Sequence, residues 1–143
     1  MSIRFYSDNI HFKLRGSRKI NSFIKTYFAE KFNKSFDTSV VFCSKDRILD
    51  INITALNHNY YTDIITFPYS DSDNIINAEI YICIDIVKEN AIDFNTDFYN
   101  ELHRVIFHGF LHLVGYKDKT KQQQLEMRKQ EDIVLAGFYK CST

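Results

Sequence analysis

The chain has 143 residues, of which 45% are hydrophobic, and this length allows one hydrophobic core but hardly two. Lys plus Arg equal Asp plus Glu at 18 each, so the overall charge neither supports nor excludes RNA binding, and any contact with nucleic acid would need a local basic patch. No stretch approaches the roughly 18 apolar residues of a membrane span, and the first residues lack a signal-peptide pattern, so we expect a cytoplasmic protein.

The first part of the chain alternates between strand patterns and helix patterns. Residues 3–6 and 39–43 are apolar and rich in β-branched or aromatic side chains, which favours strands. Between them, residues 20–28 carry apolar side chains with a period near 3.6, which predicts a helix. Ser44 can cap a further helix, whose apolar residues are Ile48, Leu49, Ile51 and Leu56.

Two more strands are predicted in the middle of the chain. Residues 63–67 and 79–85 have strand composition, and the polar residues of the segment 69–77 predict a loop between them, which forms either a hairpin or a wider excursion. The strands and helices alternate without a Gly-rich phosphate loop. We therefore expect an α+β fold in which a single domain, residues 1–143, has a four-stranded mixed sheet packed with helices.

Three helices are predicted in the last part of the chain. One begins after Ile86, Asn95 or Thr96 can cap a second over residues 97–114, and the third covers residues 120–135. The second of these helices is apolar nearly all round, so it should be the central, buried helix. Its apolar stripes are Leu102, Ile106, Phe110 and Leu113, and Phe107, Leu111 and Val114.

Residues 108–118, His-Gly-Phe-Leu-His-Leu-Val-Gly-Tyr-Lys-Asp, carry the strongest functional signal. His108 and His112 are four positions apart on this helix, so both project from one face and can share a metal ion. Gly115 can end the helix in the left-handed region, and the chain can then turn back so that Asp118 supplies a third ligand. Three ligands leave one tetrahedral position of zinc for water, which is typical of a catalytic site.

The histidine spacing alone is a weak signal. Two core histidines bonded to backbone carbonyls would produce it as well, but Gly109 clears space beside His108, and the following glycine turn brings in a carboxylate. His103 lies on another face of the helix and is expected at the surface. The cysteines are expected to be reduced and not to form a thiolate metal site, because they are odd in number and far apart: Cys43, Cys83 and Cys141.

The stretch 108–118 resembles the HGxLHLxGYDH signature of the YbeY family, with HG, LHL and GY in register. Residues 62–68, Thr-Asp-Ile-Ile-Thr-Phe-Pro, resemble that family's TDVLSFP strand, which lies beside the metal cleft. The resemblance covers roughly residues 52–127. It implies a metal-dependent endoribonuclease acting on single strands in rRNA maturation, including 16S rRNA 3′-end processing, and in ribosome quality control. Its partners would be rRNA or other RNA and ribosomal components.

The resemblance also implies a set of site residues. Zn²⁺ would be held by His108, His112 and Asp118, where Asp118 stands in place of a family histidine. A carboxylate binds zinc too, but it makes other divalent metals more acceptable. Thr62 and Asp63 are expected in the substrate cleft.

One family feature is missing from the sequence. The family has an Arg shortly before its TDVLSFP block that helps to bind the scissile phosphate. That position falls on Leu56 without a gap and on Tyr61 with one, and neither is an Arg. Arg104, one turn before His108, and Lys117 are the candidates to supply the positive charge.

We expect the chemistry to be metal-assisted phosphodiester hydrolysis, in which the ion lowers the pKa of water toward ~7 or polarises a phosphoryl oxygen. The general base is left open between Asp118, another cleft residue and the 2′-hydroxyl of the RNA. One alternative is a noncatalytic ribosome-assembly factor whose metal holds the fold. Another is a different zinc hydrolase such as a peptidase, although Gly109 occupies the place of the catalytic Glu in HExxH enzymes.

Overall fold

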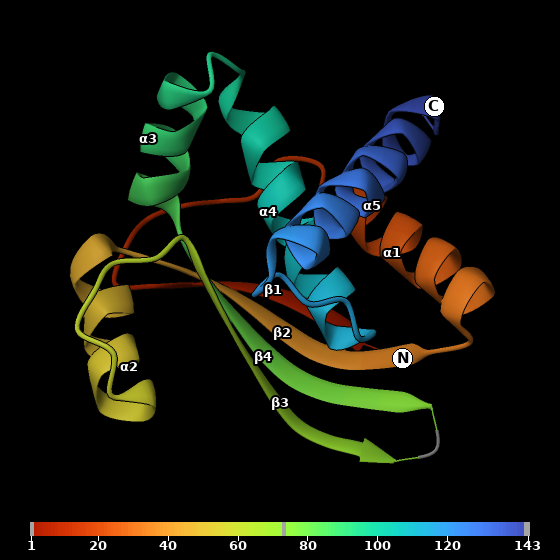
Figure 1. The fold of residues 1–143 in the computed structure, drawn as a ribbon, viewed down its shortest axis with the longest axis horizontal. Coiled ribbons are helices and arrows are strands. Elements are labelled where there is room, and N and C mark those ends of the chain that lie inside the picture. The colour runs from red at the N-terminus through yellow and green to blue at the C-terminus, as the bar shows by residue number, and fades with distance from the viewer. Residues whose placement is uncertain (1, 73, 142–143) are drawn as a thin grey trace.

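A computed structural model describes residues 2–72 and 74–141 and contains one mixed, four-stranded sheet in the order β1-β2-β4-β3 (Figure 1). The strands β1 (Ser2–Asp8), β2 (Ser35–Cys43) and β4 (Ile75–Cys83) are parallel, and β3 (Ile64–Ser72) pairs with β4 in the antiparallel direction. Helices pack on this sheet, which confirms the predicted α+β fold.

The polar segment 69–77, predicted to be a loop, is mostly strand. β3 continues to Ser72 and β4 begins at Ile75, so the two strands form a long hairpin. β3 is an edge strand, where pairing on one side suffices and polar residues and proline are tolerated. Accordingly, Pro68 lies within β3, and the register shifts between Pro68 and Ser70.

The main core lies between the sheet and the helices α1 (Ser17–Phe32), α4 (Phe98–Leu113) and α5 (Lys121–Lys140) (Figure 1). β4 turns alternate side chains toward this core, as the period of a strand requires. The prediction of a central, buried helix is confirmed for α4, because five of the seven residues in its predicted apolar stripes are fully buried, while Leu113 and Val114 are partly buried. The fully buried residues of α4 are Leu102, Ile106, Phe107, Phe110 and Leu111.

A smaller core lies beneath α2 (Lys45–Leu56). Ile48 of α2 packs there with Cys43 and Cys83, and both thiols are free, as predicted. The hydroxyl of Ser44 accepts a hydrogen bond from the backbone N–H of Arg47 at 3.2 Å, so Ser44 caps α2 as predicted. From β4 the chain continues directly into α3 (Ile84–Asp93).

The caps of the last two helices explain where they begin. Asp97 caps α4 by accepting from the backbone N–H of Asn100 at 3.2 Å, so the predicted caps Asn95 and Thr96 are wrong. Asn95 instead adopts a φ of 53° at the end of α3, where its N–H bonds to that helix. Thr120 caps α5 within a capping box, which agrees with the predicted start of this helix at residue 120.

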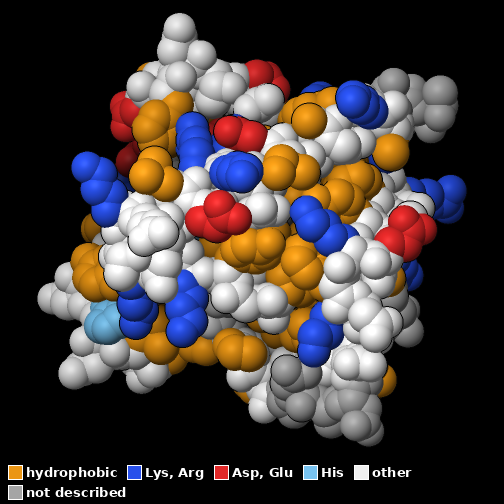
Figure 2. All heavy atoms as spheres, turned by 45° about the vertical axis from the view of Figure 1, so that its right-hand side comes forward, with side chains coloured by type: hydrophobic (Ala, Val, Ile, Leu, Met, Phe, Trp, Pro, Cys, Tyr) orange, Lys and Arg blue, Asp and Glu red, His pale blue; other side chains and the backbone are white. Residues whose placement is uncertain are grey.

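Among the described residues, no helix is long and apolar enough to cross a membrane. Figure 2 shows the face to which α1 and α5 contribute, and there the Lys and Arg side chains lie apart from one another among hydrophobic ones. Positive charge is therefore not gathered into one stripe on this face. The site described below lies elsewhere, along α4.

Candidate metal centre

The site depends on a close approach of α4 to the sheet at Gly109. A Cβ atom added there would lie 2.9 Å from Ile64 Cδ1 and 3.2 Å from Ile80 Cδ1. Only glycine permits this approach without displacing a neighbour. It brings His108 near Asp63, the residue just before β3, whose charge acts on the imidazole.

The turn after α4 returns the chain to the same helix face. Gly115 has a φ of 113°, as predicted, and its N–H bonds to the carbonyl of His112 at 3.0 Å. The N–H of Tyr116 bonds to the carbonyl of Leu111 at 3.0 Å, so these two bonds occupy carbonyls at the helix end. The turn places the carboxylate of Asp118 beside both histidines.

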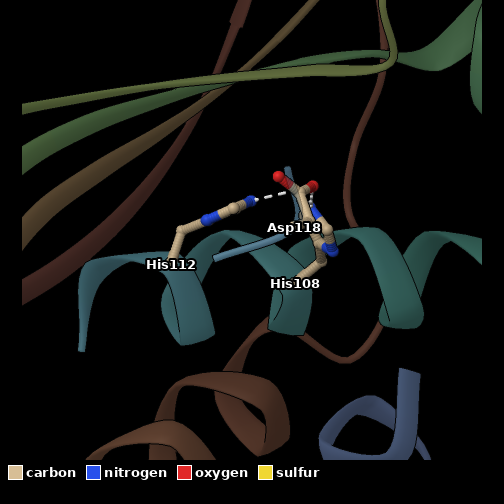
Figure 3. A group of neighbouring side chains, drawn as sticks. All are labelled: His108, His112 and Asp118. Carbon is tan, nitrogen blue, oxygen red and sulfur yellow. Dashed lines mark hydrogen bonds and ion pairs between the residues drawn. The ribbon is translucent and has the colours of Figure 1, made fainter. Parts of the chain in front are cut away.

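Three side chains converge on one point, as the sequence predicted (Figure 3). Asp118 Oδ2 lies 3.3 Å from His108 Nε2 and 3.3 Å from His112 Nε2, and the three donor atoms lie within 4.8 Å of one another. Metal–ligand bonds of about 2.0–2.2 Å at tetrahedral angles separate neighbouring ligand atoms by about 3.4 Å. The distances therefore fit a single zinc ion.

The hydrogen bonds of the two rings also fit a metal. His112 Nδ1 lies 2.9 Å from the carbonyl oxygen of Tyr116, which can only accept, so Nδ1 carries the hydrogen. In the neutral ring, Nε2 then turns a lone pair toward the Asp118 carboxylate. His108 is bound in the same way, with Nδ1 2.5 Å from Glu131 Oε2. Two lone pairs and a carboxylate that face one another need a cation or a proton between them.

Glu131 of α5 links this group to two arginines. Its Oε1 accepts from Arg104 Nη1 at 2.9 Å and lies 4.0 Å from Arg128 Nη1, while Arg104 Nη2 also donates to Asp132 at 2.8 Å. Burial is the strongest single influence and lowers the pKa of His108, but the hydrogen bond and charge of Glu131, together with the charges of Asp118 and Asp63, raise the pKa overall. Glu131 therefore orients the His108 ring and makes its Nε2 a better donor to a cation, whether a proton or a metal ion.

A cavity of about 300 Å³ opens beside the metal-binding group, between α3, α4 and α5. His108 and Asp118 line it together with side chains from each helix. Burial raises the pKa of the Asp63 and Glu101 carboxyls, which both lie in its wall. The space next to the metal position is thus polar and lined by three helices.

Only some of the other predicted site residues line the cavity. Asp63 lines the cavity, whereas Thr62 is not part of its wall and directs its hydroxyl to the Ile64 carbonyl at 3.4 Å. Arg104 lines the cavity, but two carboxylates already bind its guanidinium. Lys117 is exposed and lies outside the cavity wall. Of the two candidate cations, only Arg104 lines the cavity.

Several cavity residues had not been expected from the sequence: Phe94, Glu101, Arg128 and Glu131. One signal was available for Glu131, because it lies in the apolar stripe of α5 with Met127, Val134 and Phe138. A charged residue in such a stripe needs a buried partner. His103, expected at the surface, is instead half-buried among aromatic rings, with Nδ1 2.8 Å from the Tyr139 hydroxyl.

The fold and the donor set define a class: a small α+β protein in which three side chains that could hold a metal ion lie beside a polar cavity. The model of the family described as Endoribonuclease YbeY matches residues 3–139, and the chain belongs to this family. The family recognised from the sequence motif is thereby confirmed.

Relatives match over nearly the whole chain. The Endoribonuclease YbeY of Parabacteroides distasonis is 39% identical over 136 residues, with 95% of each chain covered. That of Cytophaga hutchinsonii is 38% identical over 135 residues, with 94% of each chain covered. The solution structure of TM1509 from Thermotoga maritima matches with a TM-score of 0.64 and 29% identity, over 98% of this chain and 93% of that one.

Proposed function

We propose that the protein is a zinc-dependent endoribonuclease that acts on single-stranded RNA in rRNA maturation, including 16S rRNA 3′-end processing, and in ribosome quality control. It works in the cytoplasm with ribosomal components, and residues 1–143 act as one metal-hydrolase domain. The observation that carries the proposal is the convergence of two imidazole lone pairs and one carboxylate on one point. The name of its relatives, Endoribonuclease YbeY, supports RNA as the substrate.

In this proposal His108, His112 and Asp118 hold the ion. Zinc, when bound, polarises a phosphoryl oxygen and acidifies water. The chain itself contributes orientation, because the Tyr116 carbonyl and Glu131 fix both rings with Nε2 toward the ion. Asp118 adds a negative charge where the family has a neutral histidine, so other divalent metals such as Mn²⁺ are acceptable alternatives.

The arginines have different roles in this proposal. Arg104 is only 15% exposed in its side chain and is bound by Glu131 and Asp132, so we assign it to holding Glu131 in place. Arg128 is 56% exposed in its side chain and forms a loose ion pair with Glu131, with 4.0 Å between Nη1 and Oε1. Its charge is therefore available to a substrate phosphate at the metal. Lys117 has no place in the wall of the cavity.

RNA cleavage by purified protein with added zinc tests the function. The wild type should bind one zinc per chain and cut a single-stranded rRNA fragment. His112→Ala should lose both properties, while His11→Ala, at an exposed histidine outside the cavity, should keep them. A wild type that leaves RNA intact, or a His112→Ala protein that cuts equally well, would refute the proposal.

A noncatalytic ribosome-assembly factor is the second candidate, because neither Leu56 nor Tyr61 supplies the expected Arg and neither lines the cavity. In that case the metal would serve the fold alone. The wild type would then not cleave RNA, and His108→Ala would unfold at a markedly lower temperature. A folded but inactive His108→Ala protein, next to an active wild type, would exclude this candidate.

A further inference from the structure

The wall of the cavity beside the metal-binding group contains a nearly buried carboxylate. Glu101 of α4 is 5% exposed and lines the cavity. Within residues 2–72 and 74–141 its side chain makes no hydrogen bond, although the charge of Arg104 acts on it. Because so little of this side chain is exposed, the cavity is the space open to its carboxylate, and a ligand there that donates hydrogen bonds would pair with its oxygens.

An exposed aromatic ring stands in the wall of the same cavity. Phe94 directly follows α3 and is 59% exposed. The backbone that carries this ring is fixed, because the N–H of Phe94 bonds to the Asn90 carbonyl at 2.9 Å and the next turn is closed by a bond from Thr96 N–H to the Ala91 carbonyl at 2.9 Å. An exposed aromatic ring beside a polar pocket is suited to stack on a flat ligand.

Two other kinds of ligand fit the cavity less well. A second metal ion lacks a ligand set, since His108, His112 and Asp118 form the sole such group found in the described part of the chain. A phosphate would meet the carboxylates of the wall, which outnumber its two guanidinium groups, and Arg104 is already bound by Glu131 and Asp132. A neutral, planar ligand with N–H donors remains, and a volume of about 300 Å³ suits such a small group.

We propose that this cavity is a nucleobase subsite: it receives the base next to the scissile phosphate, with the ring stacked on Phe94 and the donor edge on Glu101. The inference rests on the proposed endoribonuclease function. Because His108 and Asp118 line the cavity, a base bound there belongs to a nucleotide whose phosphate is at or next to the metal.

The chemistry of Glu101 selects among the bases. A carboxylate has two acceptor oxygens, and guanine presents two adjacent N–H donors on its Watson–Crick edge. Cytosine and adenine present one amino group on that edge, and uracil presents one imino group. The subsite should therefore prefer guanine, by about 10- to 100-fold in cleavage rate at this one position.

A pair of variants at the end of α3 tests the stacking. Phe94→Ala should weaken the binding of a 2′-O-methylated, uncleavable RNA about tenfold in fluorescence anisotropy with zinc present. The matched control is Ile92→Ala, because Ile92 is 79% exposed two residues away and is not part of the cavity wall. The binding assay is then repeated with a series of RNAs, each of which carries one abasic nucleotide at a different position. The difference in affinity between the two variants should disappear only when the missing base is the one next to the scissile bond.

A second variant tests the recognition of the base. Glu101→Gln keeps the shape and the fold, but its amide has one acceptor and one donor group, so the preference for guanine at that position should disappear. If wild-type protein cuts RNA while Phe94→Ala and Ile92→Ala bind alike, or while no abasic position matters, the subsite is refuted and the nuclease function stands. If the wild type cuts no RNA at all, both proposals fail.

Discussion

Replacing Glu131 with Gln should weaken zinc binding about 10- to 100-fold and leave the protein folded. Glu131 Oε2 lies 2.5 Å from His108 Nδ1 and fixes the tautomer that turns Nε2 to the ion. Gln keeps the shape but replaces a charge-assisted hydrogen bond by a neutral one of about half its strength. The expected loss of about 1.4–2.7 kcal/mol corresponds to that range of affinity, because 1.4 kcal/mol is a factor of ten.

The measurement is a competition titration of zinc against a chromophoric chelator at neutral pH, with thermal unfolding of the apoprotein beside it. Asp132→Asn is the matched control, because it removes the other carboxylate from Arg104, 2.8 Å away, without touching His108. Its zinc affinity should stay within about twofold of the wild type, since no contact of a ligand histidine is lost. If Glu131→Gln binds zinc as tightly as Asp132→Asn, the idea that Glu131 orients His108 is wrong.

Gly109→Ala should destabilise the fold by about 1–3 kcal/mol in urea denaturation, because its methyl group overlaps the sheet, whereas Gly137→Ala, with only ordinary contacts, should not. Thr120→Ala removes the N-cap of α5 and should cost about 1 kcal/mol in the same assay. Burial lowers the pKa of His103 from 6.5 to about 4. The unfolded chain therefore takes up the proton first, and stability is lost as pH falls from about 6.5 toward 4. His103→Phe should flatten this decline by about 1 kcal/mol between pH 7 and pH 5, measured by unfolding at each pH.

The local parts of the site were predictable because they obey local geometry. The spacing of His108 and His112 and the turn at Gly115 act within residues 108–118, so helix period and backbone conformation place the three side chains. Glu131 and the cavity depend on how three helices pack, which no short pattern encodes. The loop prediction for residues 69–77 failed for a related reason, since edge-strand pairing does not require apolar side chains.

Because the three donors lie in one short segment of the chain, zinc can bind at an early stage of folding. Because all three donors come from residues 108–118, an unfolded or nascent chain already carries the complete ligand set in one short segment. Zinc can then bind before the sheet has formed, and any affinity for the unfolded chain reduces the stabilisation that zinc gives to the native state. Removal of the ion by a chelator should therefore abolish activity and leave most of the domain folded. The long-range contact of Glu131 with His108 makes the folded chain bind zinc more tightly than the unfolded chain does.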